Sequence, residues 1–510
     1  MDVLKTIALL AMYLSICNTR LAWCLPAFPG AQGMGASATG ARGNVTQSVC
    51  KVTNLNDSGA GSLRACIEGA GHDGAFVVFE TSGTINLSTN ISMLSNYITI
   101  AGETSPGGIA IAGREVDIGS SGTYNMHDII IRHMRFRMGS HQCAPNCDTD
   151  HAFQIWKSHD IILDHCSFSW GIDETVGVTT YDNASVYDIT FSWCMITEGL
   201  RDPAPEVNHG YGLLLNANYS SDPQNTMTMH HCYFAHHQDR SPRASGSVFM
   251  DLRNNVIYNW ESSLNTNINV TDGVTQNLNF VGNYTKPGPD SNACDPTGNS
   301  FEMHLREGGQ ASSCPDAVNP TPYALVYMQG NLGCVRDDPA DPEWAIGCGY
   351  SGDLLSTSWR AANAFSTTDI AVTTATMSYA YAQQILQTVG ATKPVRDSYD
   401  AEMVTEFTNG TGGIKADTTW PDDWPTFSSP SAPADTDSDG MSDSWETIEY
   451  GGLAQTYNGD YDSDGYMNIE EFFFYLAGDQ DGGTPASGNV ITGGGSGTII
   501  GGGAGVVTAE

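Results

Sequence analysis

The chain has 510 residues and a formal net charge of −36, from 57 acidic and 21 basic residues. So few Lys and Arg residues argue against nucleic acid as a partner, because phosphate binding needs clustered positive charge. Hydrophobic residues make up 40% of the chain, which excludes wholesale disorder, and 56 Gly and 22 Pro favour a turn-rich β protein.

Residues 1–24 have the pattern of a signal peptide, in which Lys5 precedes an apolar run from Thr6 to Cys17. This run is too short to span a membrane comfortably, and no later stretch reaches the length of about 18 apolar residues that a span needs. We therefore expect a secreted, extracellular protein that has no membrane partner.

The 13 cysteines and the glycosylation motifs agree with a secretory route. In an oxidising compartment we expect most cysteines to be paired, with Cys143 and Cys147 as a local pair. Sequons of the form N-x-[ST] predict a glycoprotein, although an Asn-, Thr- and Ser-rich chain also produces such motifs by chance. They stand at Asn44, Asn56, Asn86, Asn90, Asn183, Asn218, Asn269, Asn283 and Asn409.

From residue 97 the chain repeats a short apolar strand that is followed by a polar turn, at intervals of roughly 20 to 40 residues. No amphipathic helix follows each strand, which disfavours leucine-rich repeats and α/β folds. Unequal spacing is typical of loops that project from the coils of a parallel β-helix, so we expect that all-β fold. The copies begin at Tyr97, Asp128, Asp160, Asp188, Thr226, Phe249 and Leu278.

Polar residues recur at corresponding turns of these repeats, namely His165, His231, Asn254 and Asn283. We expect them to form internal ladders between coils, with a structural role.

Helical spacing in residues 379–389 (YAYAQQILQTV) predicts one helix after the repeats. This helix and the segment up to Phe427 are expected to pack along the repeats or to cap them. We take 25–427 as one β-helix domain and the Ser- and Pro-rich residues 428–434 as a linker.

Two segments after the linker fit the 12-residue EF-hand loop, with Gly at position 6 and Glu at position 12. This spacing wraps carboxylates and a backbone carbonyl around a hard cation, so we expect a short helical, EF-hand-like pair at 435–477 that binds Ca²⁺. Residues 478–510 are expected to form a Gly-rich flexible tail. The expected ligands are Asp435, Asp437, Asp439, Asp443 and Glu446, then Asp460, Asp462, Asp464, Asn468 and Glu471.

Residues 230–246 (HHCYFAHHQDRSPRASG) concentrate His and Arg in a chain that is poor in basic residues. Arg240 and Arg243 flank Ser-Pro, so both guanidinium groups lie near one turn. Such a pair suits bidentate recognition of an anionic ligand. The alternative is a structural pairing of these arginines with Asp239 or Asp251.

Several motifs, in order along residues 26–427, resemble the pectate lyase superfamily, polysaccharide lyase family 1. They include AFPGAQGMGASATGARG, VTNLNDSGAGSLRACIE, ITIAGETSPGG, IIIRHMRFRMG, ILDHCSFSWGIDET, HHCYFAHHQDRSPR, DLRNNVIYNW and RDSYDAEMVTEFTNGTG. Some members of this family also carry a C-terminal Asp-rich calcium module.

The resemblance implies a right-handed parallel β-helix and cleavage of polygalacturonate by β-elimination, assisted by Ca²⁺. The family's R-x-P-R turn maps its catalytic base onto Arg240, and cationic surroundings such as Arg243 would have to depress the pKa of that arginine. A substrate-binding Lys of many members maps onto Arg201. We therefore expect Arg201 and Arg243 to bind substrate.

The expected calcium ligands of the lyase site depart from the family pattern. The D-x-x-x-D pair of the family reads Asp173 to Gly177 here, so the second carboxylate is missing. His151 replaces another acidic position, with Asp150 just before it. We expect Asp150 and Asp173 as ligands, with calcium also delivered on the substrate; Glu174 would point to the opposite face of a strand.

The leading hypothesis is an extracellular, monomeric pectate lyase whose partner is an acidic plant- or algal-type polysaccharide, with Ca²⁺ as cofactor. A lyase of methylated pectin or of another uronic-acid polysaccharide is the alternative within the same chemistry. A glycoside hydrolase would need paired carboxylates, for which Asp148, Asp150, Asp173 and Glu174 could be mistaken. A non-catalytic, wall-binding β-helix protein is the alternative from another class.

Overall fold

The structure, a computed structural model, describes residues 25–479 except 121, 123–124, 144–149, 181–183, 204–206, 218–224, 262–263, 271–273, 292–300, 308–323, 347–356 and 367–370. The expected signal peptide, Cys147, Asp148, Asn183, Asn218 and nearly all of the expected tail lie outside the described residues.

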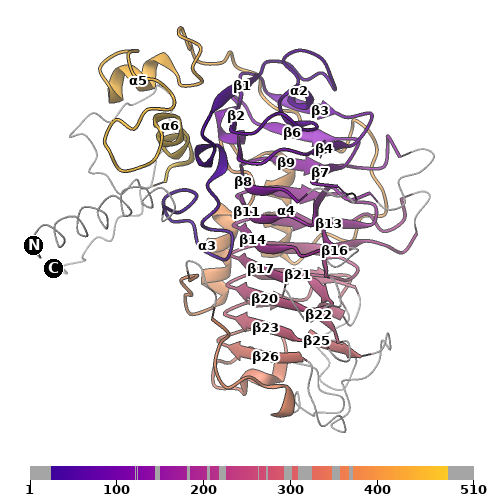
Figure 1. Ribbon diagram of the computed structural model, residues 1–510. Helices are drawn as coiled ribbons and strands as arrows, with labels where there is room; N and C mark the ends of the chain where they lie inside the picture. Colours follow the sequence, from indigo (N-terminus) through magenta and orange to yellow (C-terminus); the bar gives the residue numbers. More distant parts are fainter. Residues whose placement is uncertain are drawn as a thin grey trace, which may run out of the picture.

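Three sheets of parallel strands stack along one axis and form a parallel β-helix, as the sequence repeats predict (Figure 1). Consecutive strands of a sheet come from consecutive coils, and among the described residues eight coils supply one strand to each sheet. The first sheet comprises β1 (Ser48–Val52), β2 (Ala75–Phe79), β5 (Ile98–Ala101), β8 (His127–Arg132), β11 (His159–Asp164), β14 (Tyr187–Ser192), β17 (Asn225–His230), β20 (Val248–Arg253), β23 (Gln276–Val281) and β26 (Ala324–Gln329).

The other two sheets contain eight strands each. The second sheet comprises β4 (Ile91–Met93), β7 (Val116–Ile118), β10 (Phe153–Trp156), β13 (Glu174–Thr179), β16 (Tyr211–Asn216), β19 (Arg243–Ser245), β22 (Leu264–Val270) and β25 (Phe301–Glu307). The third sheet comprises β3 (Gly83–Asn86), β6 (Ile109–Ala112), β9 (Arg135–Arg137), β12 (Ser167–Ser169), β15 (Met195–Thr197), β18 (Tyr233–His237), β21 (Val256–Trp260) and β24 (Tyr284–Lys286).

The seven repeats of the sequence are seven consecutive strands of the first sheet, β5 to β23, which confirms that prediction. Their apolar residues stack in register inside the coils and are fully buried or nearly so. One such stack contains Ile98, Ile129, Ile161, Ile189, Met227, Met250, Leu278 and Val326. Burial of this stack supplies the hydrophobic free energy that a single coil could not supply by itself.

Polar and aromatic residues form ladders at the turns, as expected. His165 stacks between His133 and Trp193, with ring centroids 5.0 and 5.9 Å away, and Trp193 stacks on His231 at 4.2 Å. A separate ladder of asparagine side chains joins Asn283 to neighbouring coils, by hydrogen bonds with Asn255 and Asn331. Because Asn283 is fully buried in this ladder, it cannot carry a glycan in the folded protein.

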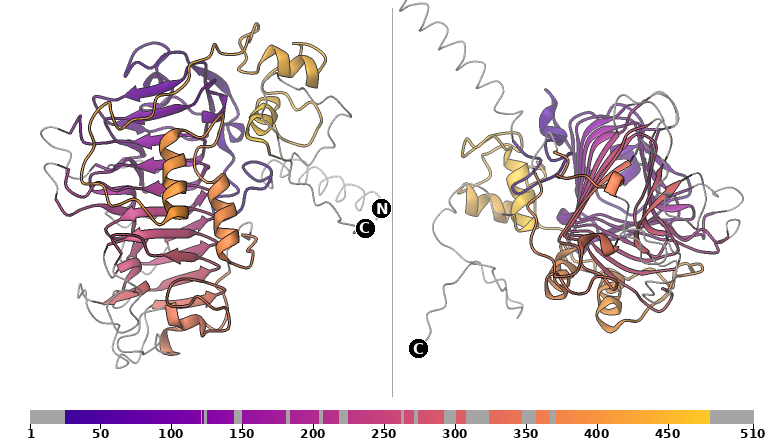
Figure 2. Two further views of the ribbon diagram at one scale, coloured as in Figure 1. Left: turned by 180° about the vertical axis from the view of Figure 1, so that it is seen from behind. Right: turned by 90° about the horizontal axis from the view of Figure 1, so that it is seen from below.

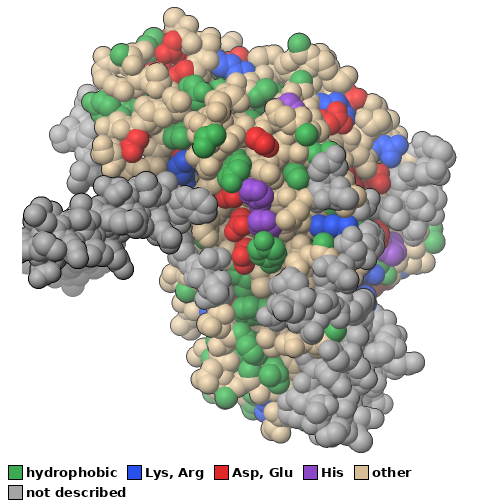
Figure 3. Space-filling view, in the orientation of Figure 1, with side chains coloured by type: hydrophobic (Ala, Val, Ile, Leu, Met, Phe, Trp, Pro, Cys, Tyr) green, Lys and Arg blue, Asp and Glu red, His purple; other side chains and the backbone are tan. Residues whose placement is uncertain are grey.

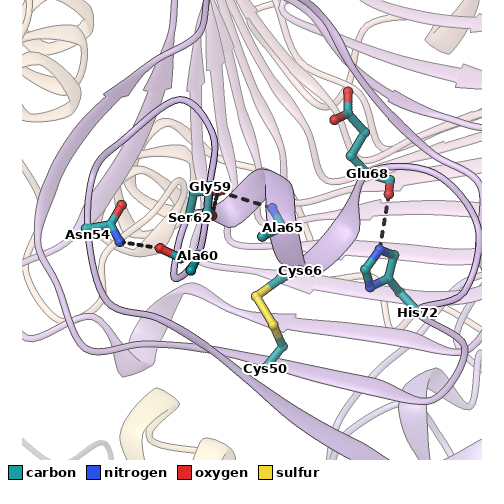
Figure 4. The surroundings of a disulfide bond; sticks show 9 residues. All are labelled: Cys50, Asn54, Gly59, Ala60, Ser62, Ala65, Cys66, Glu68 and His72. Atoms are coloured by element: carbon teal, nitrogen blue, oxygen red, sulfur yellow. Dashed lines mark hydrogen bonds between the residues drawn. A yellow bond between two sulfur atoms is a disulfide. The ribbon is translucent and has the colours of Figure 1, made fainter.

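One disulfide, between Cys50 and Cys66, ties β1 to the short helix α2 (Leu63–Ile67) that begins the stack (Figure 4). Cys143 and Cys334 are also disulfide-bonded; Cys147, the expected partner of Cys143, lies outside the described residues. By contrast, three buried cysteines in consecutive coils are free, so the expectation of pairing is wrong for them: Cys166, Cys194 and Cys232. They act as small apolar residues of the core.

Two helices, α3 (Tyr379–Thr388) and α4 (Ser398–Asn409), lie across the outer face of the third sheet (Figure 2). The first of these confirms the predicted helix, and both pack along the repeats, as expected. Buried ion pairs anchor α4, since Arg137 binds both Asp397 and Asp400 at 2.8 and 2.7 Å. The described 3₁₀ helices are η2 (Gly40–Gly43), η3 (Gly102–Thr104), η4 (Glu343–Ile346) and η6 (Thr357–Trp359).

The C-terminal segment forms two helices, α5 (Asp443–Glu449) and α6 (Asn468–Ala477), beside the β1–β2 end of the coils (Figure 1). Its apolar residues share one buried cluster with the outer face of the first sheet, in which Phe472 and Phe473 meet Phe76 and Val78. A buried ion pair of 2.7 Å joins Arg42 to Glu470 of α6. The C-terminal segment is thus packed directly against the β-helix.

Candidate active site

The candidate site lies at one edge of the second sheet, where consecutive coils enter their strands. β13 begins at Glu174 and β16 begins at Tyr211, and these two residues pair in register. Tyr211 also forms an isolated bridge with Asp239, which Arg240 follows. Three neighbouring coils therefore bring Glu174, Tyr211 and Arg240 together.

The turn that carries Arg240 holds this residue in a left-handed backbone conformation, with φ of +66°. Its backbone N–H donates to Asp239 Oδ1 at 2.6 Å. Its guanidinium group contacts Glu174, through Nη1 and Oε1, and lies over the ring of Tyr211 with Cζ 4.0 Å from the centroid. The side chain is 15% exposed, so it can reach a bound ligand from a well-packed turn.

Glu174 is the centre of a buried chain of charges. One carboxylate oxygen contacts Arg240, and the other lies 3.0 Å from His151 Nε2. The second ring nitrogen of His151 lies 2.9 Å from Glu115 Oε2. Each imidazole nitrogen thus faces a carboxylate oxygen, and only a doubly protonated ring donates to both.

The protonation states of His151, Asp117 and Glu115 follow from their burial and from the groups they contact. Burial alone would lower the pKa of His151, but the hydrogen bond and the charge of Glu115 outweigh it and leave this pKa raised. Asp117 lies beside Glu115, and burial together with that neighbouring charge raises the pKa of Asp117 to about 10. Asp117 is therefore neutral near pH 7, and Glu115 carries the negative charge.

Asp173 lies in the bend before β13 and contacts His209 through Oδ1 and Nε2. Burial would raise the pKa of Asp173, but the hydrogen bond with His209 outweighs it and leaves this pKa lowered. The ring of His209 lies 4.1 Å from that of Tyr211, centroid to centroid. A second pair of side chains in contact, Asp173 with His209, thus lies next to Arg240 and Tyr211.

The two expected substrate-binding arginines lie close to this site. Arg201 is partly exposed, and its Nη1 lies 2.8 Å from Glu261 Oε1. The backbone carbonyl of Arg201 accepts a hydrogen bond of 2.9 Å from the N–H of His209. Arg243 is the first residue of β19 and pairs in register with Leu214 of β16.

The two residues expected as calcium ligands of the lyase site are not in one cluster. Asp173 groups with His151 and Glu174, whose ligand atoms lie within 4.8 Å of one another. Asp150 instead pairs with Arg114 at 3.2 Å. The expectation that Glu174 points away from Asp173 is wrong, because Asp173 precedes the strand and strand alternation does not apply to it.

This donor set does not fit a calcium ion held by the protein. Calcium takes six to eight oxygen ligands, whereas the group here offers an imidazole and two carboxylates that already contact Arg240, His151 and His209. Gly177 itself supplies no ligand, and the end of the buried Gln154 side chain occupies the space beside it.

The two C-terminal loops fit calcium much better. Asp435, Asp437 and Asp439 converge in the first loop, and Asp460, Asp462 and Asp464 converge in the second. The position-6 glycines, Gly440 and Gly465, have φ of +94° and +103°, as the sharp turn of such loops requires. Asp443 and Asn468, at position 9, each accept a hydrogen bond from the second residue of their own loop, at 2.7 and 2.9 Å.

The position-12 glutamates are the carboxylates of these loops whose burial most favours a cationic partner. Glu446 is fully buried, and within the described residues neither of its carboxylate oxygens has a hydrogen-bond partner. Burial and the repulsion from Asp439, Asp437 and Asp435 raise the pKa of Glu446 to about 7. Burial likewise raises the pKa of Glu471 to about 8. Converging, desolvated carboxylates of this kind suit a divalent cation.

On the face shown in Figure 3, Lys and Arg side chains are dispersed among acidic ones. Positive charge at the candidate site therefore comes from individual arginines and not from a broad basic surface. In the part of the chain that the structure describes, no helix is long and apolar enough to cross a membrane.

Three residues of the site have no counterpart among the sequence-based candidates: Glu115, His209 and Tyr211. The alternation in residues 115–118 (EVDI) and the apolar run after Tyr211 were available as strand signals. Neither signal says which coil lies next to which, and that adjacency is what brings these side chains to Glu174 and Arg240.

Comparisons with known proteins support the resemblance to pectate lyases. The chain is 33% identical over 281 residues to a probable pectate lyase C of Aspergillus flavus, a match that spans 55% of this chain and 59% of that protein. A probable pectate lyase C of Emericella nidulans is 29% identical over 456 residues, which span 85% of this chain and 88% of that protein. No family model matches the chain.

Among solved structures, the major cedar pollen allergen superimposes with a TM-score of 0.47 at 14% identity, over 71% of this chain and 93% of that chain. The fold assignment therefore depends on the sheet topology of this chain alone.

Proposed function

We propose that the chain is a secreted polysaccharide lyase that cleaves polygalacturonate by β-elimination, with Arg240 as the base. The observation that carries this proposal is the position of Arg240, partly exposed in a strained turn and in contact with Tyr211 and Glu174. Similarity to probable pectate lyases over most of the chain supports it. In this proposal Arg201 and Arg243 bind uronate carboxylates.

The elimination needs a neutral guanidine. Arg240 takes the C5 proton of the uronate, the electrons of that C–H bond form the C4=C5 double bond, and the C4–O bond breaks. The leaving oxygen then takes a proton from solvent. Glu174 stabilises the charged form of Arg240 in the free protein, so this guanidinium group must release a proton to solvent when substrate binds. The neutral guanidine still donates an N–H to Glu174. His151, 3.0 Å from Glu174, remains as a partner for the carboxylate.

For calcium, we propose the two C-terminal loops as the sites, with the ligands expected from the sequence. Buried, unpartnered Glu446 and the raised pKa values of Glu446 and Glu471 support this assignment. The calcium assistance implied by the family resemblance would then have to come with the substrate, because the donor set around Asp173 does not fit the ion.

One observation favours methylated pectin as a second candidate substrate. The site is lined by carboxylates that are paired within the protein, and a methyl ester brings no further negative charge to them. An ester is also activated for elimination without a cation at its carboxyl group.

The secretory context and the division of the chain belong to the same proposal. The disulfide between Cys50 and Cys66 supports an oxidising compartment. We propose a lyase domain at 25–427, a linker at 428–434, a calcium module at 435–477 and a tail at 478–510, preceded by a signal peptide at 1–24.

The proposal is tested with purified protein on polygalacturonate and on highly methylated pectin, each with calcium or with a chelator. The readout is the ultraviolet absorbance of the 4,5-unsaturated product. A rise in absorbance on either polymer supports lyase activity. The polymer that gives the faster rise is the preferred substrate. No rise under any condition contradicts the proposal and favours a non-catalytic, wall-binding protein.

A further inference from the structure

The central carboxylates of the candidate site already contact nitrogen atoms of other side chains of the same protein. Glu174 contacts both Arg240 and His151, Asp173 contacts His209, and Asp150 pairs with Arg114. Burial strengthens the contacts of Glu174, since its side chain is only 2% exposed and little water competes for its oxygens. Asp173 and His209 are more open, at 23% and 27% exposed.

The space around Glu174 is also filled. Gln154, which is fully buried, occupies the position that a side chain at Gly177 would need. His151 lies against the same position, since a Cβ on Gly177 would come within 2.9 Å of His151 Cδ2. Neither a further carboxylate nor a hydrated ion fits between these groups without displacing one of them.

We propose that Glu174 is a positioning residue that holds Arg240 at the candidate site, and that this ion pair takes the place of a calcium ion held by the protein. His151 and Glu115 fix the orientation of Glu174 on the side away from Arg240, since Glu115 binds His151 and His151 binds the second oxygen of Glu174. Part of this inference, the role of Arg240, rests on the proposed function; the absence of a calcium ion at Asp173 does not.

Calcium stoichiometry tests the second part without any assay of activity. Isothermal titration of Ca²⁺ into the chelator-treated full chain is compared with the same titration of Asp173→Asn. We expect the same number of ions in both proteins, because calcium is confined to the C-terminal loops. A loss of one ion in Asp173→Asn would overturn the inference.

Kinetics of Glu174→Gln test the positioning role, on whichever of polygalacturonate or methylated pectin the wild-type chain cleaves. We expect kcat to fall by about 100-fold with little change in KM, because a misplaced catalytic group costs about this much and Glu174 is too buried to touch substrate. Glu174→Asp, which keeps the charge, should recover part of kcat. Glu402→Gln removes one exposed charge on α4 and controls for net charge.

The thermal midpoint of each variant shows whether it folds. If Glu174→Gln does not fold, Glu174→Asp replaces it in the kinetic comparison. Wild-type kcat in a folded Glu174→Gln protein, or a loss that appears only in KM, would overturn the positioning role. If the wild-type chain cleaves neither polymer, the proposed function fails, while the titration still decides whether calcium binds at Asp173.

Discussion

Left-handed backbone conformations at single residues recur at the corners of the coils and account for the residue types found there. Asp128, Asp160 and Asp188 have φ of 56°, 51° and 52°, and His165 and His231 have φ of 49° and 55°. Asp, Asn and His tolerate this region better than most residues. Arg240, at +66°, is not a favoured type in this conformation, but Trp170 and Trp193 adopt it as well, at 64° and 53°, so coil corners impose it on other residue types too.

Glu103 in η3 is a buried carboxyl group whose two oxygens have no hydrogen-bond partner within the described residues. Burial raises its pKa from an ordinary 4.5 to about 7. The folded state therefore binds the proton more tightly than the unfolded state, so this residue costs stability increasingly as pH rises from about 4.5 to about 7. We expect Glu103→Gln to raise the free energy of unfolding by about 2 to 3 kcal/mol above pH 7.

Below about pH 4 the same substitution should have almost no effect, because Glu103 is then mostly protonated in both states. Chemical denaturation of both proteins at an acidic and a neutral pH gives the comparison. An equal effect at both pH values would show that ionisation of Glu103 is not the cause.

Elements of the fold differ in how far the sequence predicts them. Strands of the first sheet are up to six residues long, and their β-branched or apolar residues alternate with others. This repeat can therefore be recognised in the sequence. Second-sheet strands such as β4 and β19 have only three residues, too few for a periodic signal. Arg240 and Asp173 were identified from local motifs, whereas Tyr211 and His209 join the site only because of coil stacking.

Docking of α6 on the β-helix depends on the pair of Arg42 and Glu470, whose side chains are 4% and 2% exposed. Removing one member of a buried pair leaves an uncompensated charge and costs about 3 to 5 kcal/mol. We expect Glu470→Gln to release the C-terminal helices from the coils, which makes the linker at 428–434 a faster site of limited proteolysis.

Glu449→Gln is the matched control, since Glu449 belongs to the exposed side of α5 in the same module. It should be cleaved at the wild-type rate. If Glu470→Gln is cleaved no faster than this control, the buried pair does not hold the module in place.

At the scale of the whole molecule, the acidic loops and the lyase site have opposite charge arrangements. The loops bring several carboxylates together around Glu446, whose two oxygens have no hydrogen-bond partner among the described residues, whereas Glu174 of the lyase site contacts Arg240. We expect calcium to raise the thermal midpoint in a concentration-dependent way, because it binds the folded loops. Chelation should lower the midpoint, and an unchanged midpoint would contradict calcium binding by these loops.

The account depends most directly on lyase chemistry at Arg240. The decisive measurement is the rate at which unsaturated product forms from polygalacturonate or methylated pectin. It compares wild type with Arg240→Ala and with the control Arg360→Ala, which changes a half-buried residue near the final coil. We expect Arg240→Ala to lose about a thousandfold in kcat, as removal of a catalytic base does, while Arg360→Ala keeps the wild-type rate. Full activity in folded Arg240→Ala would contradict the account.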